Sequence, residues 1–381
     1  MTETPGQTTQ VPILAYVTRP GLERLVLRNL GLNLVTLWFY RFWAKTRWRR
    51  HIWSNISLMG DPVEYTGTGA EMFKGFLIAL AVLAPLFILF NLWQWAVSDS
   101  AVGLFIEQIV YFATLYFLIV AARFYARRYR LSRTRWRGVP LALDARFIDY
   151  VKVHFTQHGI ALLTLFLLWP RASLMVEAWL MSRTRLGNAY FDCKIEWRPA
   201  FWPWITFLFG AFLTIGIILG RLAATMPQVF GDLGLPNFSL WWAFFAVLFT
   251  AASYAAYRVK LLRQTIGGLR LGDVFFTSEA QAAPIITFIV VGIATLLAIG
   301  TLGTLMVIGS GSLFVVFVMP IVFLFAFAII RDAWVAPWII DHIVTSVTIT
   351  NPSSLNDIAS GALDSMTRGE GLADSFDVGI V

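Results

Sequence analysis

The sequence is poor in charged residues and in cysteine. Only 14% of its 381 residues are charged and 58% are hydrophobic, whereas soluble domains carry about 25% charged residues. The single cysteine, Cys193, excludes an internal disulfide framework and a metal site built from a cysteine cluster. The chain also lacks a phosphate-binding loop, a zinc-protease helix motif and a nucleophile elbow. We therefore expect no enzyme activity, no catalytic residues and no cofactor.

Six apolar segments are long enough to cross a membrane. A bilayer core of about 30 Å requires a helix of about 20 residues, and short or turn-rich connections join the segments into three antiparallel pairs. The composition therefore predicts a polytopic membrane protein. The six predicted transmembrane helices are Phe73–Ala96, Ala101–Ala122, Phe201–Gly220, Phe238–Tyr257, Ile285–Gly309 and Ser312–Ile330.

Two further apolar segments, residues 25–43 and 155–169, are too short to cross comfortably. The second would span about 22 Å as a helix, and Pro170 ends it. We predict that both are re-entrant or interfacial, although a crossing remains the alternative. Matching residues at a constant offset of 128 suggest an internal duplication. The matches are Gly31 with Gly159, Thr36 with Thr164, and Leu37 with Leu165.

Basic stretches that end in turn residues follow the apolar segments. The clearest is Ser132–Gly138, within a run of seven arginines between Ala121 and Leu141. Alternating apolar and polar residues after these stretches, as in Phe191–Trp197, predict half-buried strands. A lone strand leaves its backbone groups unpaired, so we expect the strands to pair into a small β cap. Further copies of the stretch are Ser182–Gly187, Ser54–Gly60, Arg263–Gly268 and a degenerate Asp341–Thr350.

The positive charges predict the orientation of the chain. Four connections carry five, nine, five and four Lys+Arg residues, whereas the three opposite connections carry only Arg221. By the positive-inside rule the basic connections and both termini are cytoplasmic. The same bias accounts for the net charge of +8 without nucleic-acid binding. The predicted location is therefore the bacterial inner membrane, with a multi-pass topology.

One motif resembles a known family. Residues 36–47 read Thr-Leu-Trp-Phe-Tyr-Arg-Phe-Trp-Ala-Lys-Thr-Arg, which is similar to the Thr-Leu-Gly-(apolar)-Tyr-x-x-Trp-Ala-x-x-Arg signature of the YjgN family of bacterial inner-membrane proteins. The likeness covers roughly residues 20 to 350, but Trp38 stands at the usual glycine and the second short segment lacks the Tyr-x-x-Trp element. The resemblance implies a topology and a location. The family has no established function, so the resemblance implies no site residues.

Few polar residues could serve a site within the membrane. Glu107, six residues inside a predicted span, and Asn91 are candidates either for transport or for polar helix packing. His154 and His158 are four apart, but two imidazoles do not close a metal site, so we expect no metal there. Four arginines are candidates for contact with anionic lipid headgroups, the predicted partners of the chain. These are Arg133, Arg135, Arg183 and Arg185.

The sequence as a whole predicts an all-α polytopic membrane protein. It has six transmembrane helices, two short re-entrant or interfacial segments and small cytoplasmic β pieces. A polar tail covers residues 1–24, the transmembrane domain residues 25–350, and a disordered acidic tail residues 351–381. The paired interrupted segments favour a small-solute or lipid transporter or channel, because broken helices at matching positions often line transport sites. The alternative is a non-transporting scaffold or assembly partner that uses the basic cytoplasmic face.

Overall fold

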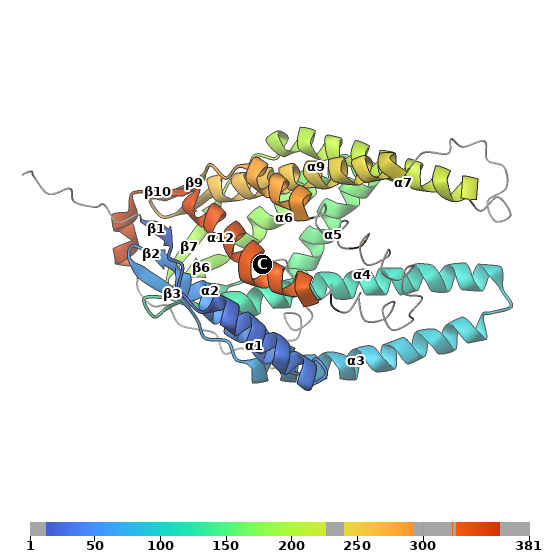
Figure 1. The fold of residues 1–381 in the computed structure, drawn as a ribbon. Coiled ribbons are helices and arrows are strands. Elements are labelled where there is room, and N and C mark those ends of the chain that lie inside the picture. Colours follow the sequence, from blue (N-terminus) through green and yellow to red (C-terminus); the bar gives the residue numbers. More distant parts are fainter. Residues whose placement is uncertain (1–12, 226–239, 293–299, 301–321, 323–324, 359–381) are drawn as a thin grey trace, which may run out of the picture.

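The computed structural model describes residues 13–225, 240–292, 300, 322 and 325–358. A β-sheet lies at one end of the molecule, and pairs of helices extend from it toward the other end (Figure 1). Each helical pair leaves the sheet and returns to it. The sheet is therefore the element to which the helical pairs within the described residues are attached.

The sheet has ten antiparallel strands that pair in sequence order from β1 to β10. Two-residue turns join the hairpins β2–β3 and β4–β5. Their residues Met59 and Gly60, and Arg137 and Gly138, all have positive φ, as tight hairpin turns require. The strands are β1 Leu14–Tyr16, β2 Ile56–Leu58, β3 Asp61–Tyr65, β4 Thr134–Trp136, β5 Val139–Leu143, β6 Thr184–Leu186, β7 Ala189–Cys193, β8 Leu269–Leu271, β9 Val274–Ser278 and β10 Val347–Thr350.

The helical pairs are of two lengths. The long helix α3 would measure about 42 Å at 1.5 Å per residue, whereas α1 would measure about 21 Å. In Figure 1 the long pairs reach the far end of the molecule and the short pairs stop before it. The short pairs are α1 Leu22–Val35 with α2 Arg41–Asn55 and α5 Phe147–Leu163 with α6 Trp169–Met181. The long pairs are α3 Gly69–Ala96 with α4 Ala101–Ser132 and α7 Phe201–Thr225 with α9 Leu240–Gly267.

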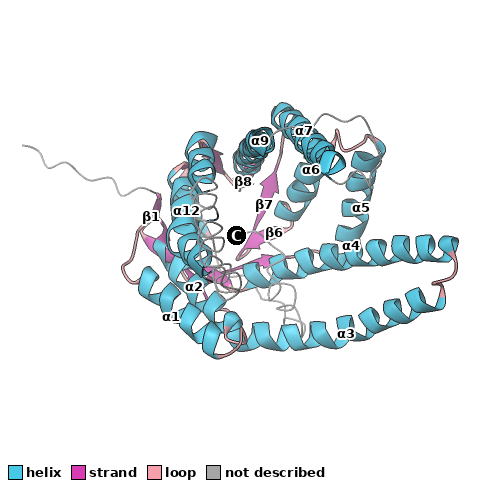
Figure 2. Ribbon diagram, turned by 45° about the vertical axis from the view of Figure 1, so that its right-hand side comes forward, coloured by secondary structure: helices cyan, strands magenta, loops and turns pink. Residues whose placement is uncertain are grey.

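Further helical elements belong to the described chain, among them the apolar helix Ala282–Gly292. The 3-10 turn η1 Arg198–Ala200 precedes α7, and the π-helical turn η2 Arg331–Val335 leads into α12 Ala336–Thr345. The 3-10 turn η3 Pro352–Asp357 follows β10. Figure 2 shows the helical pairs arranged around the sheet in chain order, so that α12 comes back beside α1.

One backbone hydrogen bond recurs at five places where two hairpins meet. In each, the residue after a strand donates its N–H to the carbonyl at the end of a helix. The recurrence defines five equivalent positions around the sheet. The five bonds are Val17 to Asn55 (2.7 Å), Thr66 to Arg133 (2.8 Å), Asp144 to Arg183 (2.8 Å), Lys194 to Gly268 (2.9 Å) and Glu279 to Ser346 (3.0 Å).

The sheet curls around a single apolar core. All ten strands contribute side chains to one cluster, which includes Trp136, Leu271 and Ile349. Leu355 of η3 joins this cluster and is 2% exposed. Residues 352–357, which the sequence placed in a disordered tail, are therefore part of the fold, and residues 359–381 of that predicted tail lie outside the described residues.

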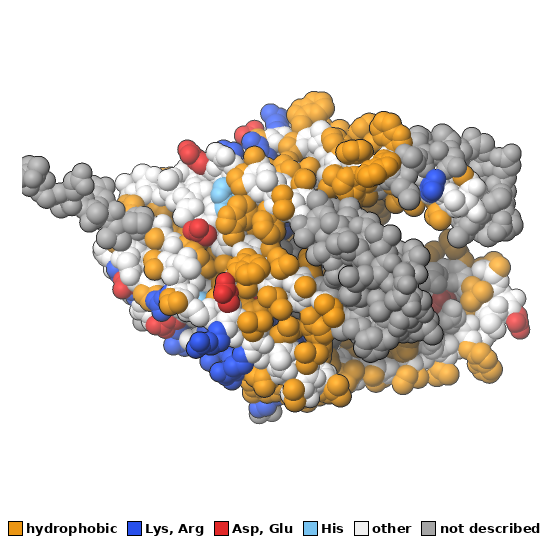
Figure 3. Space-filling model, viewed as in Figure 1, with side chains coloured by type: hydrophobic (Ala, Val, Ile, Leu, Met, Phe, Trp, Pro, Cys, Tyr) orange, Lys and Arg blue, Asp and Glu red, His pale blue; other side chains and the backbone are white. Residues whose placement is uncertain are grey.

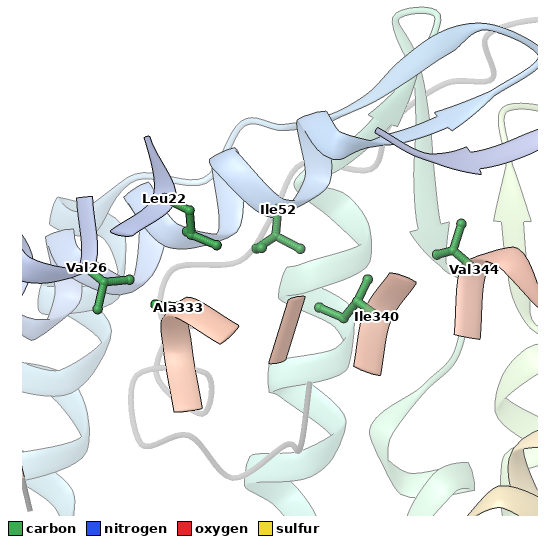
Figure 4. Close-up of a cluster of buried hydrophobic side chains, with 6 residues drawn as sticks. All are labelled: Leu22, Val26, Ile52, Ala333, Ile340 and Val344. Carbon is green, nitrogen blue, oxygen red and sulfur yellow. The ribbon is translucent and has the colours of Figure 1, made fainter. Parts of the chain in front are cut away.

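Helix packing closes the seam between the first and last strands. Among the described strands, β1 and β10 form the two edges of the sheet and share no ladder. Across this seam α1 and α2 pack on η2 and α12 through the buried side chains that Figure 4 shows. Trp48 Nε1 also donates to the Asp332 carbonyl at 2.9 Å. Six side chains form this contact: Leu22, Val26, Ile52, Ala333, Ile340 and Val344.

The internal duplication extends much further than the few matching residues. Strands β2 and β3 correspond to β6 and β7 at an offset of 128 residues, Ile56 to Thr184 and Asp61 to Ala189. Strands β4 and β5 correspond to β8 and β9 at an offset of 135, Thr134 to Leu269. The chain therefore contains two structural repeats, each with a short helical pair, a hairpin, a long helical pair and a second hairpin. The second repeat is seven residues longer because of its long helical pair.

The predicted all-α class with six transmembrane helices is wrong. The expected small β pieces form one ten-stranded sheet, and four described helices are long and apolar enough to cross a membrane. Most of the last predicted pair, Ile285–Gly309 and Ser312–Ile330, lies outside the described residues. The two short segments are helix–turn–helix pairs that begin and end at the sheet. Strands three residues long carry too little alternation to be recognised in a sequence.

Candidate functional site at the helix–sheet junction

A cluster of polar side chains lies where the first long helical pair meets the sheet. Arg133 Nη2 is 2.7 Å from Glu71 Oε1, and the Tyr129 hydroxyl donates to Glu71 Oε2 at 3.1 Å. Glu71 also forms a capping box with Thr68, in which each backbone N–H is bound by the other side chain. Arg133, a predicted lipid contact, is therefore held in an ion pair within the protein.

A second ion pair connects the two repeats. Arg127 Nη1 of α4 lies 2.8 and 2.7 Å from the two carboxylate oxygens of Glu177 in α6. The side chains are 18% and 30% exposed, so water screens the pair only in part. The pair fixes the second short helical pair against the first long one.

The other predicted lipid-binding arginines do not converge on one site. Arg183 places its guanidinium 4.0 Å from the Trp179 ring centroid, and Arg185 donates to the Gly187 carbonyl at 2.9 Å. Arg135 lies opposite Glu64 in the β3–β4 ladder, an arrangement that favours opposite charges. These side chains are half-buried. They stabilise the junction and the sheet, and a role in lipid contact stays a prediction.

The two polar residues predicted within the membrane differ in their surroundings. Glu107 is 4% exposed, and the described part of the chain provides it with no hydrogen bond or ion pair. Asn91 lies on an exposed face, where its Nδ2 donates to the Phe87 carbonyl at 2.8 Å. Because this bond lies within its own helix, Asn91 needs no partner from elsewhere. Glu107 is the stronger candidate for a role beyond packing.

The two histidines form a stacked pair. The His154 and His158 rings are 4.0 Å apart, and His154 Nε2 lies 3.0 Å from the Tyr116 hydroxyl. The Nδ1 atom of His158 lies 3.0 Å from the His154 carbonyl, which can only accept, so this nitrogen is the donor. Within the described ranges, no three His, Cys, Asp or Glu residues come together as metal ligands. The pair packs α5 against α4.

The turn of the first short helical pair satisfies its own backbone. Leu37 and Trp38 adopt φ of 49° and 71°, a left-handed conformation that is costly for bulky residues. Thr36 Oγ1 donates to the Leu32 carbonyl at 2.7 Å and accepts the Tyr40 N–H at 3.0 Å. Thr36 therefore bridges the end of α1 and the start of α2.

The second short helical pair has the same turn. Leu165 and Phe166 have φ of 51° and 64°. Thr164 Oγ1 donates to the Ile160 carbonyl at 3.1 Å and accepts the Leu168 N–H at 3.3 Å. The predicted correspondence at an offset of 128 is thus confirmed in backbone conformation and hydrogen bonding. In both turns the threonine hydroxyl therefore satisfies one backbone carbonyl and one backbone N–H at the chain reversal.

Sequence reasoning missed the acidic partners at the junction. Thr68 and Glu71 show the Thr-x-x-Glu spacing of a capping box before an apolar run, which was a readable signal. The partnership of Glu177 with Arg127 depends on how α6 packs on α4, and no local pattern reports it. The fourth basic stretch was also placed too early. Arg263 and Gln264 lie inside α9, and the corresponding helix end is Gly268.

Comparison with known proteins identifies the family of the chain. A family model described as "Bacterial protein of unknown function (DUF898)" matches residues 20–374, so the chain belongs to that family. No curated protein and no solved structure matches it.

Proposed function

We propose that this member of the DUF898 family is a multi-pass protein of the bacterial inner membrane that acts as a rigid scaffold for a partner protein at the cytoplasmic face. The signature at residues 36–47 supports placing it among the YjgN proteins of that membrane. The four long apolar helices support a place in the membrane, and the sheet supports the scaffold role.

The long helices expose apolar side chains over much of their length. Phe87 of α3 is 61% exposed, Ile109 of α4 is 53% exposed and Phe212 of α7 is 71% exposed. Water disfavours a continuous surface of this kind, whereas lipid chains match it. Figure 3 shows hydrophobic side chains covering the helices on this face and charged ones gathered toward the sheet. The surface of the long helices is therefore compatible with the hydrocarbon region of a membrane, and the surface near the sheet is compatible with water.

The charge distribution favours a cytoplasmic sheet. The basic residues that follow α4 and α6 lie at the sheet, whereas the turn between α3 and α4 at residues 97–100 has none. The described ends of the chain, β1 and η3, are also at the sheet. The positive-inside rule then predicts that both termini are cytoplasmic.

The observation that best supports the scaffold proposal is the ladder between β5 and β6. It pairs Leu141 with Leu186 and Leu143 with Thr184, and so joins the first repeat to the second. Many transporters expose their site alternately by rocking one repeat against the other. Here such a motion would break sheet hydrogen bonds and the Arg127–Glu177 ion pair. A continuous sheet instead holds the helical pairs in fixed positions.

The outer face of the sheet offers a surface for a partner protein. It carries charged residues in opposite-sign ladder positions, such as Asp192 opposite Arg270. Two exposed aromatic rings lie among them, Tyr190 at 52% and Phe275 at 38%. Aromatic residues within a polar surface are typical of protein contacts.

A second function, transport, is favoured by one observation. Glu107 is buried and is the only Asp, Glu, Lys or Arg among residues 101–122 of α4, and ionisable groups in such positions often serve ion or proton pathways. In this case the function would depend on the carboxylate.

One experiment separates the two functions. A photocrosslinking residue at Phe275 or Tyr190 should capture one stoichiometric partner in cells, and the same residue at Thr206, an exposed position on α7, should not. Purified protein in vesicles should show no flux that depends on Glu107. A saturable flux that Glu107→Gln abolishes, with no captured partner, would overturn the scaffold proposal in favour of transport.

A further inference from the structure

We propose that the turns of both short helical pairs bind lipid acyl chains in the leaflet next to the sheet, and that the α5/α6 turn lies deeper than the α1/α2 turn. The inference rests on the proposed place of the long helices in the membrane. It adds a second lipid contact, made by helices that do not cross.

The outward face of α1 changes from charged to apolar along its length. Arg24 and Arg28 are exposed near the sheet, one helical turn apart. Toward the turn, the exposed side chains are Leu34 at 47% and Val35 at 83%, followed by Leu37 at 83%. Cationic side chains followed by apolar ones are the pattern of a helix that enters the interface from water.

The outward face of α5 repeats this change. Arg146 and Lys152 are exposed near the sheet. Phe155 is 41% exposed one turn further on, and the end of the helix exposes Leu163 at 86%, followed by Leu165 at 81%. Lys152 and Leu165 correspond to Arg24 and Leu37 at the offset of 128 residues. The same gradient therefore occurs twice, in two places around the sheet.

The chemistry of the turns fits hydrocarbon better than a solute or a protein loop. In hydrocarbon every backbone N–H and C=O must find an internal partner, and Thr36 and Thr164 provide such partners across the two chain reversals. The side chains around them are leucine, valine, phenylalanine and tryptophan, which offer apolar surface. The exposed apolar surface also continues the one on the long helices, as Figure 3 shows on one face.

Length limits how far the turns can reach. At 1.5 Å per residue, α1 and α5 measure about 21 and 25 Å, and part of each lies beside the sheet. A hydrocarbon core is about 30 Å thick. Each turn can therefore enter one leaflet and return, which agrees with both ends of each pair joining the same sheet.

The two repeats differ in charge near the turn. Four residues after Leu37, Arg41 places its guanidinium 4.9 Å from the Phe42 ring and 5.2 Å from the Phe76 ring. The corresponding residue in the second repeat is Trp169, and no charged residue lies between Lys152 and Arg171. A guanidinium favours the headgroup level. We therefore expect the α5/α6 turn to be the deeper one.

Spin labels on the full-length chain test the proposal. In a Cys193→Ser background, single labels are placed at Leu37→Cys and Leu165→Cys, with Arg24→Cys and Lys152→Cys as matched positions near the sheet. The protein is reconstituted in phosphatidylethanolamine–phosphatidylglycerol vesicles. Accessibility to oxygen, which enters lipid, is compared with accessibility to a water-soluble nickel chelate. A label at Phe87→Cys on α3 reports whether the long helices are in lipid at all.

The expected result is a ratio of oxygen to nickel accessibility roughly tenfold higher at both turns than at Arg24 and Lys152, because polar species are excluded from hydrocarbon. The ratio should be higher at Leu165 than at Leu37. Nickel access at the turns, or no access by either reagent as in a contact with a second copy, overturns the proposal when Phe87 reports lipid. Nickel access at Phe87 would instead overturn the proposed membrane location. A ratio at Leu37 equal to or above that at Leu165 would overturn the difference in depth.

Discussion

The two repeats have the same backbone arrangement but different side chains at corresponding positions. In the first repeat Thr66 donates its N–H to the Arg133 carbonyl, and in the second Lys194 donates to the Gly268 carbonyl. Arg133 also holds the Glu71 carboxylate, whereas Gly268 has no side chain and Pro199 stands at the position of Glu71. The backbone bond between the strand and the helix end is thus common to both repeats. The side-chain ion pair beside it occurs in the first repeat, whereas the second has glycine and proline at the same positions.

A second pair of positions exchanges the sign of a charge. In the first repeat, buried Arg49 lies 3.4 Å from the Tyr65 hydroxyl. At the offset of 128 residues these positions become Glu177 and Cys193, and Glu177 forms its ion pair with Arg127. A cation in one repeat thus replaces an anion in the other. The duplicated backbone tolerates both because each charge finds its own partner.

The largest effect should follow from adding one carbon to Gly268. A Cβ there would lie 2.5 Å from the Lys194 carbonyl oxygen, which is backbone and held in the β7–β8 region of the sheet. Gly268→Ala should lower the free energy of unfolding by about 2–3 kcal/mol, because the sheet must move to make room. The measurement is thermal unfolding of the purified protein in lipid nanodiscs.

The neighbouring glycine provides the control. A Cβ at Gly267 meets nothing within 4 Å, so Gly267→Ala should be neutral or slightly stabilising at this helix end. Arg133→Ala, at the corresponding position of the first repeat, should cost less than Gly268→Ala because Arg133 already has a Cβ. Equal losses for Gly267→Ala and Gly268→Ala would contradict the tight contact with Lys194.

The Glu71 ion pair of the first repeat should have a smaller effect. Glu71→Gln keeps the geometry of the capping box but leaves Arg133 without its anionic partner. We expect a loss of about 1–2 kcal/mol, since a hydrogen bond to a charged group exceeds a neutral one but both side chains are partly solvated. Glu279→Gln, an exposed residue outside this cluster, should change stability by less than about 0.5 kcal/mol. Equal effects of the two substitutions would show that the ion pair between Arg133 and Glu71 does not stabilise the fold.

The ion pair between Arg127 and Glu177, which connects the two repeats, should contribute even less to the free energy of unfolding. A double-mutant cycle with Arg127→Met and Glu177→Gln isolates the coupling between the two side chains. We expect about 1 kcal/mol, because both side chains remain partly in contact with water. A coupling near zero, with the single variants folded, would mean that the sheet alone holds the repeats together.

The sequence predicted the turns that recur in the repeats better than the way in which the ten strands close into a curled sheet. The Ser-to-Gly spacing located the turns at Gly60 and Gly138, where the structure has positive φ, but it did not reveal the strand that precedes each turn. The same reasoning placed the fourth turn at Gly267–Gly268 instead of Gly272, because Arg263–Gly268 resembles the motif while its arginine lies in a helix. The closure of the sheet depends on the packing of α1 and α2 against η2 and α12, in which Trp48 and Asp332 meet across 284 residues of sequence. No local pattern encodes such contacts.

Only those parts of the candidate site that depend on residues close together in the sequence could be predicted. The equivalence of the segments around Thr36 and Thr164 followed from residues that recur at one offset, and the structure confirms it, whereas the turn within each segment was not predicted. The burial of Glu107 could not be read from its neighbours in sequence, since it depends on what packs against α4. The same limit applies to Arg133, which looked free for lipid until the fold placed Glu71 beside it.

Cys193 occupies the position in the second repeat that Tyr65 occupies in the first. We expect the smallest effect here, because the native Cys193 thiol should hardly react. Burial raises the pKa of the Cys193 thiol to about 12, and the nearby carboxylates of Glu177 and Asp192 add to the shift. At pH 8 a thiol with this pKa has about a thousandfold less thiolate than one with a pKa of 9, and the thiolate is the reactive form. N-ethylmaleimide should therefore label the native protein very slowly and the unfolded protein quickly.

A thiol in the first repeat provides the matched comparison. In a Cys193→Ser background, Tyr65→Cys places a thiol beside Arg49, where the second repeat has Glu177. A nearby cation lowers the pKa of a thiol and a nearby carboxylate raises it. The thiol at position 65 should therefore react faster than Cys193 at pH 8, and the difference should shrink as the pH rises and deprotonates Cys193. Equal rates at pH 8 would mean that burial alone controls both thiols, and that the charges at position 49 in α2 and position 177 in α6 do not affect the thiols in β3 and β7.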